Sequence, residues 1–243
     1  MRFLYQFLLF GLFVWFYFGL ALVVPSVSKA EIDSELTAQG WREFTFDDKA
    51  ENRFRLRPDI GGRQAVIEVE SRQSVSIAYL PFDKEEIDLK KTPYLAFSWQ
   101  RLGRAINTDV SKKGGDDRII AVYVAFPYQP DKASFSERLL RPLVEAKQGK
   151  DAPGRILTYL WAGGPMPGQW FENPYTGKAG YMRILQAPSA EAHQWFDHKP
   201  NIAADFKDSF GYWPPSPSYI AIASDSDDTS SHLSVLVTTP QFQ

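Results

Sequence analysis

The sequence predicts an all-β protein, mainly a two-layer antiparallel β-sandwich with one or two short helices. Three observations support this fold class. Short segments such as residues 64–71 alternate apolar and polar side chains with a period of two, which is typical of strands with one wet face. Residues 118–128 are apolar on both faces, which indicates a central strand between packed layers. Only residues 134–149 and 199–211 show helical spacing.

The expected strands run along the whole chain after a short polar stretch at residues 31–40. Residues 41–46 alternate clearly, and the short basic segment 53–57 is expected to be the solvated face of a strand. Residues 74–82 follow residues 64–71 after a small polar gap, so we expect these two segments to form a hairpin. The further expected strands are residues 93–102, 118–128, 156–162, 181–187, 218–224 and 233–242.

Two helices and one long loop interrupt this pattern. The helix expected over residues 134–149 has four apolar residues at helical spacing and contains Pro142. The helix expected over residues 199–211 has one apolar stripe, and Gly211 is a typical stop signal. Proline and glycine cluster in residues 163–180, which predicts one turn-rich surface loop.

The N-terminus predicts export. Arg2 precedes an uninterrupted apolar run from Phe7 to Val24, and small residues at Ser28 and Ala30 fit a cleavage site. The run is also long enough to span a bilayer as an uncleaved anchor. We therefore expect residues 1–30 to be a signal peptide or membrane anchor. Residues 31–243 are expected to form a single β-sandwich domain outside the cytoplasm, in the periplasm.

Composition excludes some partners. The leader holds two of the 27 basic residues and none of the 29 acidic residues, so residues 31–243 have 25 basic against 29 acidic residues. This balance provides no basic field, and nucleic acid is excluded as an expected partner. The chain has no cysteine, so no disulfide stabilises it despite export.

Aspartates gather beside the ends of two expected strands. They are Asp116 and Asp117 before residues 118–128, and Asp225, Asp227 and Asp228 after residues 218–224. If these strands are antiparallel neighbours, five carboxylates crowd one rim of the sheet. Like charges at such distances repel or raise one another's pKa, and a cation, or Arg118 and Arg183, would relieve the repulsion.

The spacing of Asp225, Asp227 and Thr229 is similar to the start of a calcium loop, because hard cations prefer oxygen ligands. It is not an EF-hand, since Ser230 and Leu236 replace the glycine and glutamate of that motif. The candidate metal ligands, with Ca²⁺ as the cation, are Asp116, Asp117, Asp225, Asp227, Asp228 and Thr229. The alternatives are that these residues only cap turns, as aspartate commonly does, or that they perform acid–base catalysis.

Five segments in this order are similar to a known family: LKKTPYLAFSWQ, GGDDRIIAVYVAF, ILTYLWA, NIAADFKDSFG and IAIASDSDDTSS. Together they resemble the bacterial domain-of-unknown-function 3047 family over most of residues 41–243. The resemblance implies an exported, jelly-roll-like β-sandwich with no assigned activity. The residues that fall on its motif positions are Asp116, Asp117, Trp161, Asp205, Asp225, Asp227, Asp228 and Thr229.

Aromatic residues near loops suggest a second kind of site. Trp170, Trp213 and Tyr212 lie in or beside segments rich in glycine and proline, and flat rings can stack on sugars. We take these three as candidate ligand-binding residues for carbohydrate or another envelope component. Trp161 ends an apolar strand and is expected in the core.

Catalytic motifs are scarce. The sequence has no G-x-S-x-G, no H-E-x-x-H, no Walker A motif and no G-x-G-x-x-G. Glu68 and Glu70 share one strand face and could belong to a glycosidase groove, which needs two facing carboxylates. The sequence thus favours an exported, non-catalytic binding module without a certain cofactor. The alternatives are a glycan-active hydrolase using acidic residues and a membrane-tethered structural protein, the membrane being a partner only if the leader is retained.

Overall fold

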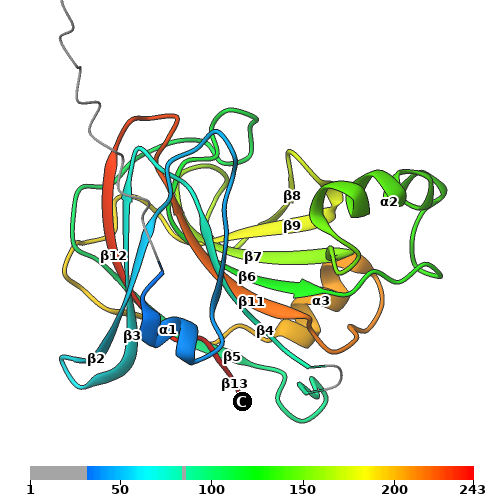
Figure 1. Cartoon of the computed structure of the whole chain (residues 1–243), viewed down its shortest axis with the longest axis horizontal. Helices are drawn as coiled ribbons and strands as arrows, with labels where there is room; N and C mark the ends of the chain where they lie inside the picture. Colours follow the sequence, from blue (N-terminus) through cyan, green and yellow to red (C-terminus); the bar gives the residue numbers. More distant parts are fainter. Residues whose placement is uncertain (1–31, 84–85) are drawn as a thin grey trace, which may run out of the picture.

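The computed structural model describes residues 32–83 and 86–243 (Figure 1). The predicted leader, residues 1–30, lies outside these described residues. In the described part, no helix is both long and apolar enough to cross a bilayer. The helices are α1 (Ser34–Ala38), α2 (Phe135–Gln148) and α3 (Ile202–Phe210). The strands are β1 (Arg42–Phe44), β2 (Arg53–Ile60), β3 (Arg63–Arg72), β4 (Ile77–Pro81), β5 (Leu95–Arg101), β6 (Arg118–Phe126), β7 (Arg155–Trp161), β8 (Trp170–Asn173), β9 (Gly177–Gln186), β10 (Phe196–His198), β11 (Tyr219–Asp225), β12 (His232–Thr238) and β13 (Gln241–Phe242).

The strands form two layers. One sheet has seven strands in the order β1-β4-β11-β6-β7-β9-β8. The other has six strands: five in the order β10-β5-β12-β3-β2, and β13, which also pairs with β5. The all-β, jelly-roll-like sandwich expected from the sequence is confirmed. Neighbouring strands are antiparallel except β7 and β9, which pair in parallel. β8, which lies between them in sequence, occupies the outer edge of the sheet and is antiparallel to β9.

The core lies between the two sheets. Large aromatic side chains fill it, and Trp99 and Trp161 lie with ring centroids 6.1 Å apart across the layers. Trp161 is fully buried, as expected. The central position of β6 explains its apolar character on both faces, since Val122 faces this core and Ala121 belongs to a second buried cluster on the outer face of the larger sheet.

The two expected helices are present, and their ends follow from capping residues. Ser134 and Glu137 form a capping box at the start of α2. The Asn201 side chain accepts from the Ala204 N–H at the start of α3, and Gly211 ends α3 with a φ of 83°. Inside the polar stretch expected at residues 31–40, the structure adds the short helix α1.

The expected hairpin between residues 64–71 and 74–82 was wrong. β3 belongs to the smaller sheet and β4 to the larger one, so the chain changes layers between them. Gln73 has a φ of 51°, and Val75 forms an isolated bridge with Asp225 of the larger sheet. This turn directs β4 away from β3.

The loop expected over residues 163–180 was also partly wrong. It contains β8, which forms a hairpin with β9, so Trp170 lies on a strand at the edge of the larger sheet. The signal was hidden because the strand is short and is surrounded by glycine and proline.

The last long strands join the parts of each sheet. β11 lies between β4 and β6 in the larger sheet, and β12 lies between β3 and β5 in the smaller one. The connection from β11 to β12, residues 226–231, carries the chain from one layer to the other (Figure 1). This layer-crossing loop contains the acidic sequence singled out above.

Candidate functional site

The acidic residues meet at one end of the two central strands of the larger sheet. β6 and β11 are antiparallel neighbours, and Asp225 lies opposite Arg118 across a register shift. Asp117 directly precedes β6, whereas Asp227 follows β11 within the layer-crossing loop. The antiparallel register therefore brings the two aspartate groups together.

Three carboxylates converge most closely. Asp117, Asp225 and Asp227 each offer one oxygen atom, and these atoms lie within 4.8 Å of one another. Asp117 and Asp225 are buried, with 1% and 4% of their surface exposed. Such a set of oxygen atoms suits a hard cation such as Ca²⁺.

Each of these carboxylates also has a partner within the protein. Asp225 Oδ2 accepts from Arg118 Nη1 at 2.9 Å, and Asp227 pairs with Lys49. Asp117 Oδ2 accepts from the backbone N–H of Thr229 at 2.7 Å and from its hydroxyl at 2.5 Å. Asp117 thus caps the layer-crossing loop, which is the structural role that the sequence left open.

The remaining predicted ligands point elsewhere or are exposed. Asp116 Oδ1 accepts from the Tyr175 hydroxyl at 2.6 Å. Asp228 is exposed, and its backbone N–H donates to Asp117 Oδ1 at 3.3 Å. The Thr229 hydroxyl is committed to Asp117. Arg183, proposed as a neutralising residue for the rim, instead pairs with Asp205 at 3.3 Å.

One oxygen in the cluster remains unsatisfied. Asp225 Oδ1 is buried and receives no hydrogen bond from any donor among the described residues. Burial raises the pKa of Asp225 to about 8 against the opposing effect of Arg118, and Asp227 raises it further. This oxygen can therefore be satisfied in two ways, by a proton shared with Asp227 or by a bound cation.

A network of buried polar residues lies next to the acidic cluster and fixes its position. The Ser71 and Ser226 hydroxyls are 2.7 Å apart, and Ser74 O accepts from the Ser226 backbone N–H at 3.2 Å. The Asn52 side chain donates to the backbone oxygen of Ser224 at 2.8 Å. These contacts tie both sheets to the layer-crossing loop, so the positions of Asp225 and Asp227 are set by a rigid base.

The candidate aromatic residues do not join the acidic cluster. Trp213 is 64% exposed and has the Lys207 ammonium 4.4 Å from its ring centroid. Tyr212 packs against Phe206 at 5.2 Å, and Lys132 lies 5.6 Å from its ring. Both lie near α3 and the start of α2, which Figure 1 places at the far end of the strands from the layer-crossing loop.

Trp170 belongs to a different, partly buried cluster that the sequence did not single out as a site. The Tyr159 hydroxyl donates to Asp205 Oδ2 at 2.7 Å, and Arg183 also contacts Asp205. The Trp170 ring packs on Tyr159 at 5.6 Å, with Arg183 above it at the same distance. The available signals were the polar Asp205 within the apolar stripe of residues 199–211 and its place among the family's motif positions. Its burial now raises the pKa of Asp205.

The pair considered for glycoside hydrolysis is neutralised by arginine. Arg57 pairs with Glu68 at 2.6 Å and Arg53 with Glu70 at 3.5 Å, both between β2 and β3. This is the ordinary ion-pair pattern of a solvated sheet face. These two glutamates therefore give the hydrolase alternative no support.

Comparison with known proteins gives a family and distant likenesses in fold. A family model described as "Protein of unknown function (DUF3047)" matches residues 39–239. No curated protein matches the chain. The structure is similar to Trichoderma harzianum endoglucanase 3 of family GH12, with 9% identity, a TM-score of 0.42, and coverage of 84% of this chain and 95% of that one.

Two further solved structures show the same degree of likeness. An ENZbleach xylanase mutant is 11% identical with a TM-score of 0.44, covering 83% of this chain and 78% of that one. The xyloglucanase domain of NopAA from Sinorhizobium fredii, solved with cellobiose, is 9% identical with a TM-score of 0.39. The match covers 84% of this chain and 97% of that one. Likenesses at this level assign no activity to this chain.

Proposed function

This chain belongs to the DUF3047 family of proteins of unknown function, and from that premise we propose that it is an exported, non-catalytic binding module. Its ligand would be a carbohydrate or another component of the cell envelope, and its place the periplasm. A calcium ion at the layer-crossing loop would support the fold rather than touch the ligand. The proposal therefore separates a stabilising site from a recognition site.

The unsatisfied oxygen of Asp225 is the observation that carries the calcium part. A buried carboxylate oxygen without a donor is costly. Once Asp225 loses the proton that it can share with Asp227, a cation held between Asp117, Asp225 and Asp227 would remove that cost. The five aspartates of the rim face two directly paired cations, Arg118 and Lys49, so negative charge remains in excess when all are ionised. Ca²⁺ accepts six to eight oxygen ligands, and water or backbone oxygens can supply the rest.

The same contacts favour binding over catalysis. Asp117 caps the loop, and Asp225 and Asp227 form ion pairs, so these carboxylates are committed to holding the structure. A carboxylate that acts on a substrate needs to reach it, whereas Asp117 and Asp225 are buried. The acidic cluster is thus better suited to a stabilising ion.

Trp213 supports the carbohydrate part. It is the most exposed of the three candidate aromatic residues, and its neighbour Lys207 adds a hydrogen-bond donor beside the ring. A flat indole ring stacks on the apolar face of a sugar, and an ammonium donates to hydroxyl oxygens. Tyr212 and Trp170 are more buried, so they would position the surface rather than provide most of the contact.

Thermal unfolding of the full chain with excess Ca²⁺, and then with a chelator, tests the calcium part. A ligand at about one hundred times its Kd stabilises a protein by about 2.7 kcal/mol, which corresponds to roughly 5–10 °C in Tm for a chain of this size. We expect that shift in the natural chain and its loss in Asp225→Asn. Asp151→Asn, an exposed acid near α2, is the matched control and should keep the shift.

No shift in the natural chain would refute the calcium site and leave the aspartates as loop caps. A shift that survives in Asp225→Asn would place the ion elsewhere.

Co-sedimentation with a panel of insoluble polysaccharides, including peptidoglycan, tests the recognition part. We expect retention by the natural chain and its loss in Trp213→Ala, because the exposed ring supplies the stacking surface. The variant should unfold at the natural Tm, since the ring is not in the core. Retention that is unchanged by the substitution would reject Trp213 as the binding residue.

A further inference from the structure

Helix α2 presents its apolar face to solvent. Phe135, Leu139 and Leu143 are 76%, 68% and 66% exposed, and their spacing of four residues places them in one stripe along the helix. Leu140 lies next to this stripe and is 53% exposed. We call these four residues the α2 apolar stripe. Folded monomers rarely expose a contiguous group of large apolar side chains without a use for it.

The opposite, polar face attaches α2 to the rest of the protein. Arg155 Nη1 donates to Glu137 Oε1 at 2.6 Å. The Arg141 side chain is only 11% exposed, donates to Glu145 at 2.7 Å, and lies 4.4 Å from the Tyr128 ring. The helix is therefore held by charged side chains with its leucines turned outward, the reverse of an ordinary surface helix.

The start of α2 is fixed by a capping box. The Ser134 side chain accepts from the Glu137 N–H at 3.2 Å, and the Glu137 carboxylate accepts from the Ser134 N–H at 2.6 Å. This reciprocal cap fixes where the first turn starts. The rotation of the stripe toward solvent follows from the Glu137–Arg155 and Arg141–Tyr128 contacts.

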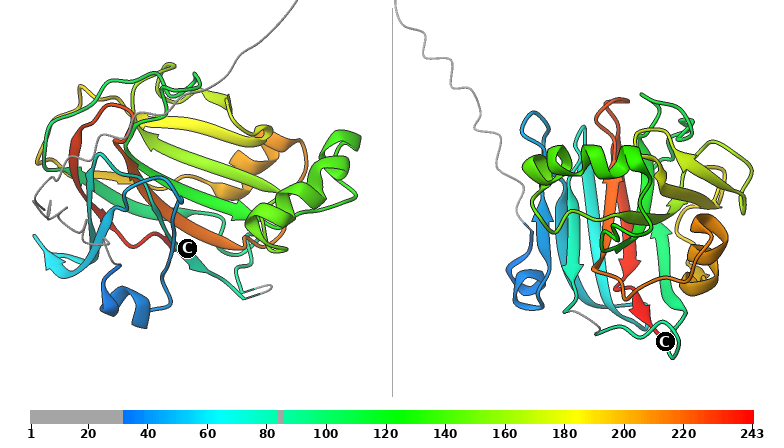
Figure 2. Two further views of the ribbon diagram at one scale, coloured as in Figure 1. Left: turned by 45° about the horizontal axis from the view of Figure 1, so that its top comes forward. Right: turned by 90° about the vertical axis from the view of Figure 1, so that its right-hand side faces the viewer.

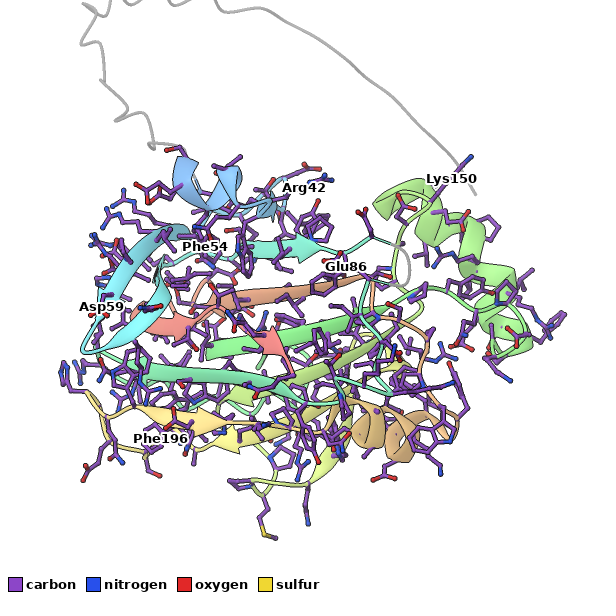
Figure 3. The ribbon with its side chains drawn as sticks, turned by 90° about the horizontal axis from the view of Figure 1, so that it is seen from below. Arg42, Phe54, Asp59, Glu86, Lys150 and Phe196 are labelled. Carbon is purple, nitrogen blue, oxygen red and sulfur yellow. The ribbon has the colours of Figure 1, made fainter. Side chains whose placement is uncertain are left out.

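The position of α2 in the molecule bears on what covers it. Figures 2 and 3 show α2 projecting from one end of the sandwich, with its C-terminal end on the same side of the molecule as α1. Ile32, the first described residue, leads directly into α1. The sequence before it contains the 18-residue apolar run from Phe7 to Val24, and the eight Cα-to-Cα steps from Val24 to Ile32 can span at most about 28 Å. A chain held in a bilayer by this run would keep α1 and the C-terminal end of α2 close to the lipid.

We propose that α2 lies in the interface of a lipid bilayer, with the α2 apolar stripe buried among the headgroups and upper acyl chains. A stripe of phenylalanine and leucine on a helix with a charged opposite face is the pattern of interfacial helices. Exposed Arg138 flanks the stripe and can reach anionic headgroups. This inference does not depend on the proposed calcium or carbohydrate sites.

The chain has no cysteine, so a single label can report on one position. Leu139→Cys and Leu143→Cys would each carry an environment-sensitive fluorophore in the full chain, mixed with vesicles of phosphatidylethanolamine and phosphatidylglycerol. The control is Asp59→Cys, an exposed site at the end of the molecule away from α2 (Figure 3). The readout is local to the label, so it works whether or not residues 1–30 remain on the chain.

At positions 139 and 143 we expect a shift to shorter wavelength, a several-fold rise in emission, and quenching by nitroxide lipids. Position 59 should show none of these changes. Labels at 139 and 143 that stay in water when vesicles are present would overturn the proposal. Protection without vesicles that increases with protein concentration would also overturn it, because a second copy of the chain would then cover the stripe.

The variant with Leu139→Ser and Leu143→Ser gives a second measurement. It should lose vesicle-dependent protection of a label at Phe135→Cys while keeping the natural Tm, since all three side chains are exposed. Protection that persists in this variant would show that the stripe is not the contact surface.

Discussion

Helices α2 and α3 both have an apolar stripe at helical spacing, but α3 buries its stripe and α2 exposes it. In α3 the apolar residues Ile202, Ala203 and Phe206 are buried, and Phe206 lies 4.5 Å from the Phe126 ring of β6. In α2 the apolar residues face outward, and the charged residues Glu137 and Arg141 make the contacts with the sheet end, to Arg155 and Tyr128. A stripe at helical spacing therefore predicts a helix but does not predict which face the protein covers.

The difference arises from what surrounds each helix. α3 is adjacent to the aromatic core, where Phe206 also contacts Phe210 and Tyr212. α2 follows β6 beyond the end of the sandwich (Figure 1), and its leucine side chains remain exposed there. At this end Arg155 pairs with Glu137, and Tyr128 lies against Arg141, so the polar side of α2 faces the protein.

The largest test of this comparison is a pair of truncations to alanine. Phe206→Ala should cost about 3–5 kcal/mol of unfolding free energy, because it opens a cavity between α3 and β6. Leu139→Ala should change it by less than about 0.5 kcal/mol, because the side chain is already in solvent. Urea denaturation of the two variants measures both values. Similar losses in the two variants would mean that α2 buries its stripe within the protein.

A smaller effect should appear when the pH is lowered, because Glu137 of α2 and Asp205 of α3 change their contributions to stability in opposite directions. Burial raises the pKa of Glu137, but the hydrogen bond from the Ser134 N–H and the Arg155 ion pair outweigh it and hold that pKa below its ordinary value. Its stabilising contribution is therefore present above the ordinary pKa and is lost as pH falls through the folded-state value. Burial raises the pKa of Asp205, so its contribution is present at low pH and is lost as pH rises.

Acidification from about pH 5 to pH 3 should thus loosen α2 and not α3. Hydrogen exchange of peptides covering residues 135–148 and 202–210, corrected for the intrinsic effect of pH, measures this difference. Glu137→Gln should abolish the pH response of the first peptide and leave the second unchanged. If both helices lost protection in parallel in the natural chain, the different attachment of α2 would be rejected.

The sequence was sufficient for the features that depend on local pattern. Alternation located most strands, the apolar faces of β6 placed it at the centre, and the antiparallel pairing of β6 with β11 brought Asp117 and Asp225 together. It was not sufficient where distant contacts decide. The parallel pairing of β7 with β9 depends on how the chain returns after β8, and the layer change after Gln73 depends on Val75 meeting Asp225.

The same limit applies to the candidate sites. Aspartates beside strand ends are visible in sequence, but their partners Lys49, Arg118 and Thr229 come from three separate segments. The Tyr159–Asp205–Arg183 cluster was missed because its members lie on different elements with no shared spacing. Long-range packing, not residue type, determines both arrangements.

The central places of β11 and β12 have a consequence for biosynthesis. Without these strands, β1 and β4 are separated from β6, and β2 and β3 are separated from β5, so neither sheet is continuous. The two halves of the sandwich can join only when residues 219–238 have been synthesised, and such non-local pairing is slow. A chain whose sheets stay discontinuous until its last strands are made keeps unpaired strand edges open throughout its synthesis.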